Sequence, residues 1–414
     1  MSTDPQNPPR VEPEDLERLA GRMDPAELEL LHRAARRWAE IKEKGGKVVV
    51  ATGSGPHLHE GVTVLIAELV RRGLVDGVLT SSAVVAHELA GSLERVRRVD
   101  GRRLGWPAGA LPADGMVEVA LLSPEQLAFH QRHTELDLEL YRRMLAAPGH
   151  EIIKVAGNLA YPTGLWLERL ARRLLPLAQA RGITLEEFTG PAADPRTMLG
   201  ACARRGVPLV VTVPQLVGGG QVGLCIADSV SITRRSSLVA GLLASADLIL
   251  ESGVALTQEI HDGPFELYTG HGLWAHHEGM PCFSLEKKDV VRLDLDPALK
   301  AAWQRQRRAG EVAAAIDRGR PKAVSLGLAF RMEMSGFARL PGSLPVTCDL
   351  GVAWPLLAHK LASLLGVKLD FLCYKQGTDL GERIREYIVR HLAPLDPAPL
   401  DPAPLMERGG QGRA

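Results

Sequence analysis

The sequence predicts an α/β protein: an open, doubly wound, mostly parallel β-sheet with a helical N-terminal extension. Two observations predict this fold. Short runs of Val, Ile and Leu recur along the chain, and such runs are typical of strands that are buried on both faces. Most of them end in a turn of Gly, Ser or Asn residues, after which apolar residues return at helical spacing. Repeated strand–turn–helix units form parallel sheets with right-handed crossovers.

The N-terminal extension comprises residues 1–46, a loose arm followed by two helices. Helices are predicted over Pro13–Met23 and Pro25–Lys44, because each begins with a proline and has acidic residues in its first turn. Gly45 and Gly46 end the second helix. Its apolar residues recur at helical spacing, so it has a face that must pack on another part of the protein.

One sheet domain is expected over residues 47–392. The apolar runs predict seven or eight short strands, at residues 47–52, 77–80, 152–156, 207–213, 248–250, 290–295, 345–348 and 369–374. Helical periodicity and capping residues predict helices at residues 61–72, 83–93, 123–147, 164–181, 195–205, 236–244, 297–308, 311–317, 353–365 and 379–392.

Two stretches fall outside this alternation. Residues 97–122 are rich in Gly and Pro and are predicted to form an insertion, which serves as a lid, an interface arm or plain surface. Residues 393–414 repeat Leu-Asp-Pro-Ala-Pro, which predicts a solvated, disordered tail. Because the insertion and the N-terminal helices have apolar faces that need cover, we expect a homo-oligomer.

Composition excludes several classes of protein. The 414 residues include 49 basic and 49 acidic side chains, so the formal net charge is zero, which argues against a nucleic-acid partner. No apolar run reaches the roughly 18 residues of a membrane span, and the N-terminus lacks the apolar segment of a secretion signal. The five cysteines form no CxxC pair, so we expect reduced, buried thiols in a cytoplasmic protein that does not associate with membranes.

The loops after the first two predicted strands carry hydroxyl groups and glycines. In an open α/β sheet ligands bind at the carboxyl ends of the strands. Thr52-Gly53-Ser54-Gly55 lets backbone N–H groups approach a phosphate, and Thr80-Ser81-Ser82 can bond a ribose or a phosphate, or simply cap the next helix. Since the first loop matches neither GxGxxG nor the phosphate-binding loop GxxxxGK, its alternative is a tight turn with no ligand.

Three further strand exits are candidates for ligand contacts. Gly157-Asn158 can orient a substrate amide or form an ordinary turn. Gly218 and Gly219 allow close approach of the backbone or a mobile loop. Asp294 ends an apolar strand, where an acidic side chain can bind the ribose hydroxyls of NAD. Together these loops predict NAD as the cofactor.

The histidines suit proton transfer better than metal binding. No HExxH helix is present, and we expect no metal site. Imidazole exchanges protons near neutral pH. His261, which is followed by Asp262, lies in the segment after the strand predicted at 248–250 and is the preferred acid–base pair.

Several segments resemble a known family. ATGSG, GVLTSSAVVAHEL, KVAGNLAYP, DPRTMLGACARRGVPLVVTVP and SADLILESG, in this order, resemble the deoxyhypusine synthase fold family. GVLTSSAVVAHEL, ASADLIL, VVRLDLDPALKAA and VTCDLGVAWPLLAHKL are similar to a sister group named lysine-oxoglutarate reductase/saccharopine dehydrogenase, whose recognised activity is ornithine cyclodeamination. The resemblance covers roughly residues 47–365 and implies a Rossmann-type sheet that binds NAD. It also implies dinucleotide contacts for Thr52, Gly53, Ser54, Thr80, Ser81, Ser82 and Asp294.

The chain departs from the synthases at their nucleophile. The synthases carry a lysine in a GGGxxKHH segment, and Leu256 stands at that position here. The Asp-Gly turn of the synthases is replaced by residues 217–220. Without the amine, transfer of an aminobutyl group to a protein lysine is not supported.

What the two groups share is NAD-dependent oxidation of an amine-bearing carbon. The leading hypothesis is an ornithine-cyclodeaminase-like enzyme that acts on a small amino acid or polyamine. In it, Glu251, Asp228 and Asp262 bind the cationic amine and His261 takes its proton. The alternative is a non-catalytic protein that binds a nucleotide or small ligand and has lost the nucleophilic lysine.

Overall fold

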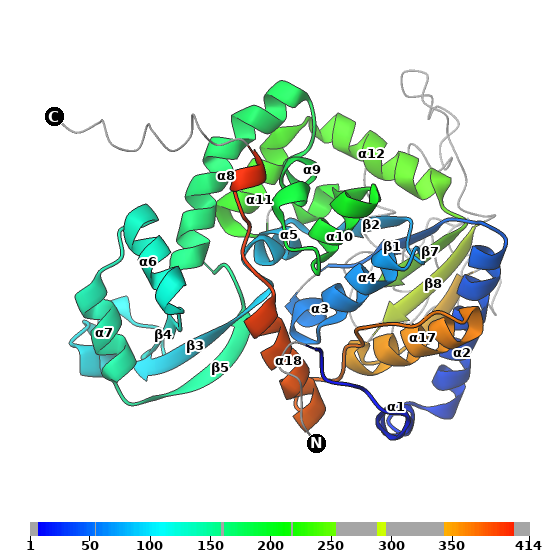
Figure 1. Cartoon of the computed structure of the whole chain (residues 1–414), viewed down its shortest axis with the longest axis horizontal. Coiled ribbons are helices and arrows are strands. Elements are labelled where there is room, and N and C mark those ends of the chain that lie inside the picture. Colours follow the sequence, from blue (N-terminus) through cyan, green and yellow to red (C-terminus); the bar gives the residue numbers. More distant parts are fainter. Residues whose placement is uncertain are drawn as a thin grey trace, which may run out of the picture.

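Six parallel strands form the central sheet of the protein (Figure 1). The computed structural model describes residues 7–53, 55–158, 161–216, 218–253, 288–294 and 343–400. The strand order is β6-β2-β1-β7-β8-β9, and each neighbouring pair is parallel, which confirms the predicted fold class. The strand bounds are β1 (Val48–Ala51), β2 (Gly77–Thr80), β6 (Leu209–Val211), β7 (Leu248–Ser252), β8 (Asp289–Asp294) and β9 (Ser343–Thr347).

Helices cover both faces of this sheet. On one face α12 (Ile232–Ser245) packs against Val49, Leu79 and Ile249. The other face is covered by helices that share one large apolar core with the alternate residues of the strands. The helices of that core are α1 (Pro13–Ala20), α2 (Pro25–Glu43), α3 (Gly55–His59), α4 (Val62–Arg71), α5 (Ser82–Leu89), α8 (Pro162–Arg181), α9 (Leu185–Thr189), α10 (Met198–Arg205), α11 (Gly220–Ser229), α17 (Leu350–Leu365) and α18 (Asp379–His391). The N-terminal extension is therefore helical, as predicted, and α2 docks on α17 and β9.

A smaller antiparallel sheet is inserted in the connection between β2 and β6, and Figure 1 shows it beside the central sheet. Its strand order is β4-β3-β5, with β3 (Leu93–Asp100), β4 (Met116–Ala120) and β5 (Gly149–Val155). Two helices belong to this part of the chain, α6 (Pro124–His133) and α7 (Leu138–Ala146). We call β3, β4, β5, α6 and α7 the small lobe.

The small lobe corrects three expectations from the sequence. Residues 97–122 contribute to strands β3 and β4, and the strand predicted at 152–156 pairs antiparallel with β3 instead of joining the parallel sheet. The fully buried residues of β3 are Leu93, Val96 and Val99, so arginines between them hide the alternating pattern of a strand. The helix predicted over 123–147 is divided in two, because the side chain of Asp137 caps a new helix by accepting the N–H of Leu140 at 2.9 Å.

Other elements also differ from the expectations. The strand predicted at 369–374 is absent from the described sheets, and the Asp370 N–H bonds to the Glu68 carboxylate instead of a neighbouring strand. The tail is not solvated from residue 393 onward. The Leu395 N–H donates to the Leu89 carbonyl at 2.8 Å, and Leu395 and Leu400 are 4% and 5% exposed. The helices predicted at 297–308 and 311–317 and residues 401–414 lie outside the described residues.

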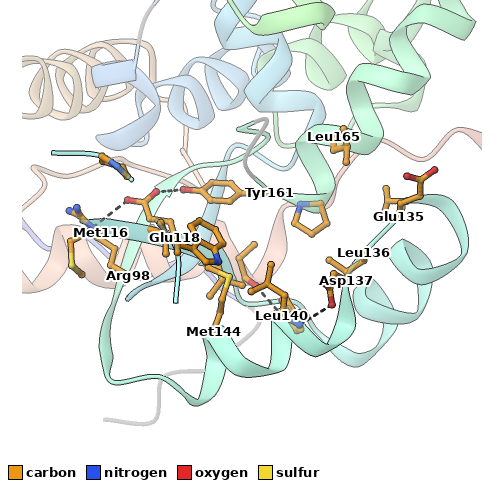
Figure 2. A pocket seen from close by; sticks show the side chains of 18 of the residues that line it. Arg98, Met116, Glu118, Glu135, Leu136, Asp137, Leu140, Met144, Tyr161 and Leu165 are labelled. Carbon is orange, nitrogen blue, oxygen red and sulfur yellow. Dashed lines mark hydrogen bonds and ion pairs between the residues drawn. The ribbon is translucent and has the colours of Figure 1, made fainter. Parts of the chain in front are cut away.

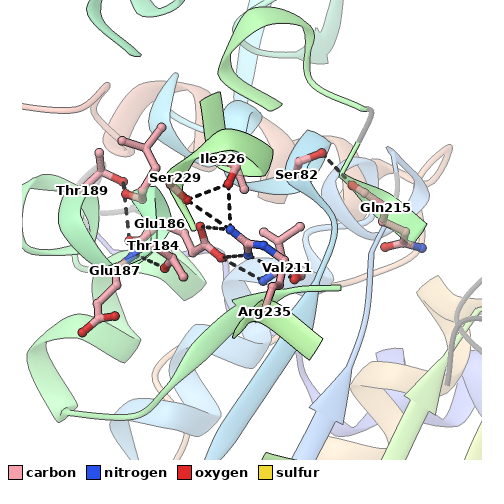
Figure 3. Close-up of polar contacts among 11 residues, drawn as sticks. Ser82, Thr184, Glu186, Glu187, Thr189, Val211, Gln215, Ile226, Ser229 and Arg235 are labelled. Atoms are coloured by element: carbon pink, nitrogen blue, oxygen red, sulfur yellow. Dashed lines mark hydrogen bonds and ion pairs between the residues drawn. The ribbon is translucent and has the colours of Figure 1, made fainter. Parts of the chain in front are cut away.

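The outer edge of β6 is completed by a buried ion pair (Figure 3). Val211 lies on this edge strand, and its N–H and C=O point away from β2. The Glu186 carboxylate accepts the Val211 N–H at 3.1 Å, and the Arg235 guanidinium donates to the Val211 carbonyl at 3.2 Å. Arg235 also donates to Glu186 and to the Ile226 carbonyl. Side chains thus satisfy the backbone groups that a further strand would otherwise pair.

We predict that Arg235→Met destabilises the protein by about 3–5 kcal/mol, since it leaves the fully buried Glu186 carboxylate without its counter-charge. Arg36→Met is the matched control, because Arg36 pairs with Glu29 at the surface and its loss should cost less than about 1 kcal/mol. Urea denaturation of the two variants measures both values. Equal midpoints for both variants would contradict the role of Arg235.

Candidate functional site

The strand order reverses at β1, which pairs with β2 on one edge and with β7 on the other. The register places Thr52, Thr80 and Ser252 side by side where β1, β2 and β7 end. Because side chains alternate between the two faces of a strand, these three hydroxyls point to the same face, and all three residues are 0% exposed. We call them the hydroxyl row. Open α/β sheets bind ligands at such a reversal of strand order.

The hydroxyl row is confined to the three central strands. The residues at the same level on β6, β8 and β9 are Val211, Leu293 and Val346. The Oγ1 atoms of Thr52 and Thr80 are buried and have no hydrogen-bond partner among the described residues. Buried hydroxyls are normally hydrogen-bonded, so a polar group from outside the described chain is expected to reach them.

The third hydroxyl has two aromatic partners. Nε1 of Trp354, on α17, donates to Ser252 Oγ at 3.0 Å, and Nε2 of His57, on α3, lies 2.7 Å from the same oxygen. His57 is 1% exposed, and its Nδ1 has no hydrogen-bond partner among the described residues. Burial lowers the pKa of His57 to about 4, so the ring is neutral at pH 7.

The loop after β1 approaches the loop after β2 closely. A Cβ atom at Gly53 would lie 2.8 Å from Gln215 Oε1 and 3.1 Å from the Ser81 nitrogen, so a larger residue would have to displace the Gln215 side chain and shift the loop at Ser81 slightly. Gly55 begins α3, and Ser54 lies outside the described residues. The predicted Thr52-Gly53 turn therefore lies where the strand order reverses, at the end of β1, which we call the reversal point.

The hydroxyls that follow β2 serve the fold. Ser81 caps α5, since its Oγ accepts the Val84 N–H at 3.1 Å. Ser82 Oγ lies 2.6 Å from the Gln215 carbonyl oxygen and 2.7 Å from the Gly218 carbonyl oxygen, and Figure 3 shows Ser82 turned toward Gln215. Ser82 thus ties the exit of β2 to the exit of β6.

Gly218 and Gly219 lead into helix α11, which the sequence analysis did not predict. Gly219 has a φ of 80°, and a Cβ there would lie 2.9 Å from the Ser82 carbonyl oxygen. The Glu168 carboxylate, from α8, accepts the Gln221 N–H at 3.0 Å. The N-terminal end of α11 is therefore already bonded to an anionic group of the same chain.

Gly157 and Asn158 lie where the small lobe joins α8, and a Cβ at Gly157 would lie 2.6 Å from Ala90 Cβ, at the C-terminal end of α5. The Gly157 N–H donates to Glu94 Oε1 at 3.0 Å, and burial raises the pKa of Glu94 to about 8. Asn158 is exposed, and its carbonyl accepts the Tyr161 N–H at 2.9 Å. This turn connects β5 to α8.

The predicted acidic residues are spread over the protein. Glu251 points to the face opposite the hydroxyl row, where Arg292 lies 3.9 Å from its carboxylate. Asp228 is exposed near the C-terminal end of α11, and Asp294 ends β8. His261, Asp262 and Leu256 lie outside the described residues. The structure thus brings together Thr52, Gly53, Thr80, Ser81, Ser82 and Gly218. Gly157 packs further along α5, beside Ala86 and Ala90.

Sequence reasoning did not assign Ser252, His57 or Trp354 to the site. A signal was present for Ser252, because it is the polar end of an apolar strand at the level of Thr52. His57 and Trp354 are 195 and 102 residues away from Ser252 in the sequence, so only the fold brings them together.

The described residues lack two other kinds of feature. They contain no group of three or more His, Cys, Asp or Glu side chains that is placed to hold a metal ion. None of their helices has the length and apolar character needed to cross a membrane. The four described cysteines are buried and free, as expected, namely Cys202, Cys225, Cys348 and Cys373.

The chain is distantly similar to solved structures. The sequence matches no protein-family model and no curated protein. ArgZ, an arginine dihydrolase from the ornithine-ammonia cycle in cyanobacteria, is 15% identical with a TM-score of 0.37, over 83% of this chain and 32% of that one. AgrE, solved as a ternary complex with ornithine and NAD+, is 15% identical with a TM-score of 0.40, over 83% and 34%. A conserved LOR/SDH protein from Methanococcus maripaludis S2 is 11% identical with a TM-score of 0.40, over 83% and 69%.

The chain spans about a third of the length of ArgZ and AgrE. At these identities and TM-scores the likeness assigns no activity, substrate or cofactor. The function is therefore argued from the chain's own residues.

We predict that His57 makes stability depend on acid pH. Its pKa is about 4 in the folded protein, against an ordinary value of 6.5, so only the unfolded chain binds this proton between those values. The contribution is complete above pH 6.5 and is lost as the pH falls toward 4, by roughly 3 kcal/mol at about 1.4 kcal/mol per pKa unit.

Chemical denaturation between pH 4 and 7 tests this. His57→Gln should flatten the decline in unfolding free energy, whereas His150→Gln, at an exposed histidine of β5, should keep it. The same decline in all three proteins would show that His57 is not the group responsible.

Proposed function

We propose that the chain binds NAD at the reversal between β1 and β7 and oxidises the amine-bearing carbon of a small amino acid or polyamine. The observation that carries the proposal is the pair of buried hydroxyls of Thr52 and Thr80, which have no hydrogen-bond partner among the described residues. They stand where a sheet of this strand order binds a dinucleotide.

The exits of β1 and β2 supply the cofactor contacts in this proposal. Thr52 and Thr80 offer hydroxyls to a ribose or a phosphate, and Gly53 leaves the backbone free of a side chain. Ser81, Ser82 and the Gly218–Gly219 turn hold these loops in position. Asp294 stays a candidate for the ribose hydroxyls. The chemistry that NAD supplies when bound is acceptance of a hydride.

The chain's own part is to hold the amine and a proton beside the cofactor. His57 is neutral, bonds to Ser252 and has an Nδ1 without a partner among the described residues, so it can accept a hydrogen bond from a substrate ammonium, although its low pKa makes it a poor base for that proton. Glu251 faces away from the hydroxyl row and is a weaker candidate for the amine. His261 and Asp262 stay candidates on the sequence alone.

We predict that Thr52→Val and Thr80→Val each weaken NAD binding roughly threefold to tenfold, because each removes one hydrogen-bonding group without changing the side-chain shape. Thr63→Val is the matched control, since the buried Thr63 hydroxyl on α4 also lacks a partner in the described part of the chain but lies outside the hydroxyl row. Isothermal titration calorimetry measures the affinities. No heat from NAD or NADP at millimolar concentration would overturn the proposal.

We also predict turnover with NAD and one member of a panel of ornithine, lysine, agmatine and spermidine. Release of ammonia or a transient NADH absorbance is the expected signal. Binding of NAD with no turnover on any of the four would favour the alternative, a binding protein that has lost its catalytic activity.

A further inference from the structure

A cavity of about 720 Å³ lies in the small lobe, at the edge strand β4 (Figure 2). Its apolar lining reaches both faces of β4: Val119 lies with Leu140 and Met144 of α7 on one face, and Met116 lies on the face of Glu118. Trp106, between β3 and β4, also lines it. The volume falls in the range of small-molecule sites, about 300–1,000 Å³. The apolar wall suits an aliphatic chain.

One end of the cavity is polar. Glu118 accepts hydrogen bonds from the Tyr161 hydroxyl and, at 2.7 Å, from Lys154 Nζ. Arg98 Nε lies 3.5 Å from the other oxygen of Glu118, and Arg98 also donates to Asp114. Burial raises the pKa of Glu118, but the hydrogen bonds from Lys154 and Tyr161 outweigh burial and hold the pKa below its ordinary value. Glu118 is thus a carboxylate at neutral pH.

The other end of the cavity has two more acidic residues, and Figure 2 shows Glu135 and Asp137 there, across from Glu118. Both are exposed, and neither forms an ion pair with another described residue. The lining thus contains four carboxylates, from Asp114, Glu118, Glu135 and Asp137, against the single cation of Arg98. Even with Lys154 behind Glu118, negative charge is in excess.

We propose that this cavity is a binding site for a small aliphatic amine, whose chain lies along the apolar wall and whose ammonium group faces the carboxylates. An aliphatic carboxylate would meet the excess negative charge, and an uncharged chain would leave Glu135 and Asp137 without a counter-ion among the described residues. The site belongs to a different sheet from the reversal point and does not depend on NAD binding there.

Calorimetry of the full chain with n-hexylammonium, hexanol and hexanoate, without NAD, tests the site. Hexylammonium should bind at least about tenfold more tightly than hexanol, and hexanoate should bind least. Glu118→Gln should weaken hexylammonium binding roughly tenfold and change hexanol binding little, and Met144→Trp should abolish binding of both by filling the cavity. Glu187→Gln, at an exposed carboxylate of α9, is the matched control and should bind hexylammonium like the unmodified chain.

Equal affinities for hexylammonium, hexanol and hexanoate would overturn the proposal, as would unchanged binding in a folded Glu118→Gln variant. Circular dichroism establishes that each variant is folded. If Glu118→Gln does not fold, Glu135→Gln takes its place, because Glu135 is exposed at the rim, and its expected loss is about twofold to threefold.

Discussion

Both neighbours of β1 run parallel to it, and this constraint determines where the protein can hold a ligand. The chain leaves β1 toward β2 on one side, and it leaves β7 toward β8 on the other, so the exits of these two neighbouring strands diverge. Thr52, Thr80 and Ser252 end these three strands, whereas Val211, Leu293 and Val346 stand at the same level further out. Buried hydroxyls without a partner among the described residues also occur elsewhere, for example at Thr63 and Ser236, so the reversal point is distinguished by two of them side by side at the ends of adjacent strands, where a ligand is expected.

At the edge of the same sheet, by contrast, the buried polar groups are hydrogen-bonded by side chains of the chain itself. At β6 the carboxylate of Glu186 and the guanidinium of Arg235 satisfy the outward N–H and C=O of Val211, and Arg235 further bonds to Ile226. At the centre, Ser252 has His57 and Trp354, but the two threonine hydroxyls beside it have no partner among the described residues. The chain evidently can complete a buried polar network with its own side chains. Where it does not, a partner from outside is the simpler account.

The sequence predicts the parts of this architecture that local patterns encode. Apolar runs locate the six parallel strands, and the hydroxyl- and glycine-containing exits of β1 and β2 are identified from their place after those runs. The small lobe is missed because Leu93, Val96 and Val99 recur every third residue in a strand crowded with arginines. The partners of Ser252 and of Val211 are missed for another reason. They come from distant segments, so only the folded chain brings them into contact.

Helix α8 connects the two places where ligands are proposed. Its first turn carries Leu165, which lines the cavity of the small lobe, and the next turn carries Glu168, which accepts the Gln221 N–H of α11. Gly218, just before α11, accepts the bond from Ser82 at the exit of β2. A packed helix moves as a unit. Helix α8 therefore links the cavity to the loop that follows β2. Coupling between the two sites requires that α8 have two arrangements and that the two ligands favour them differently. The contacts of α8 alone do not establish two such arrangements. The proposed amine site therefore stands on its own cavity and charges, whether or not it influences the reversal point.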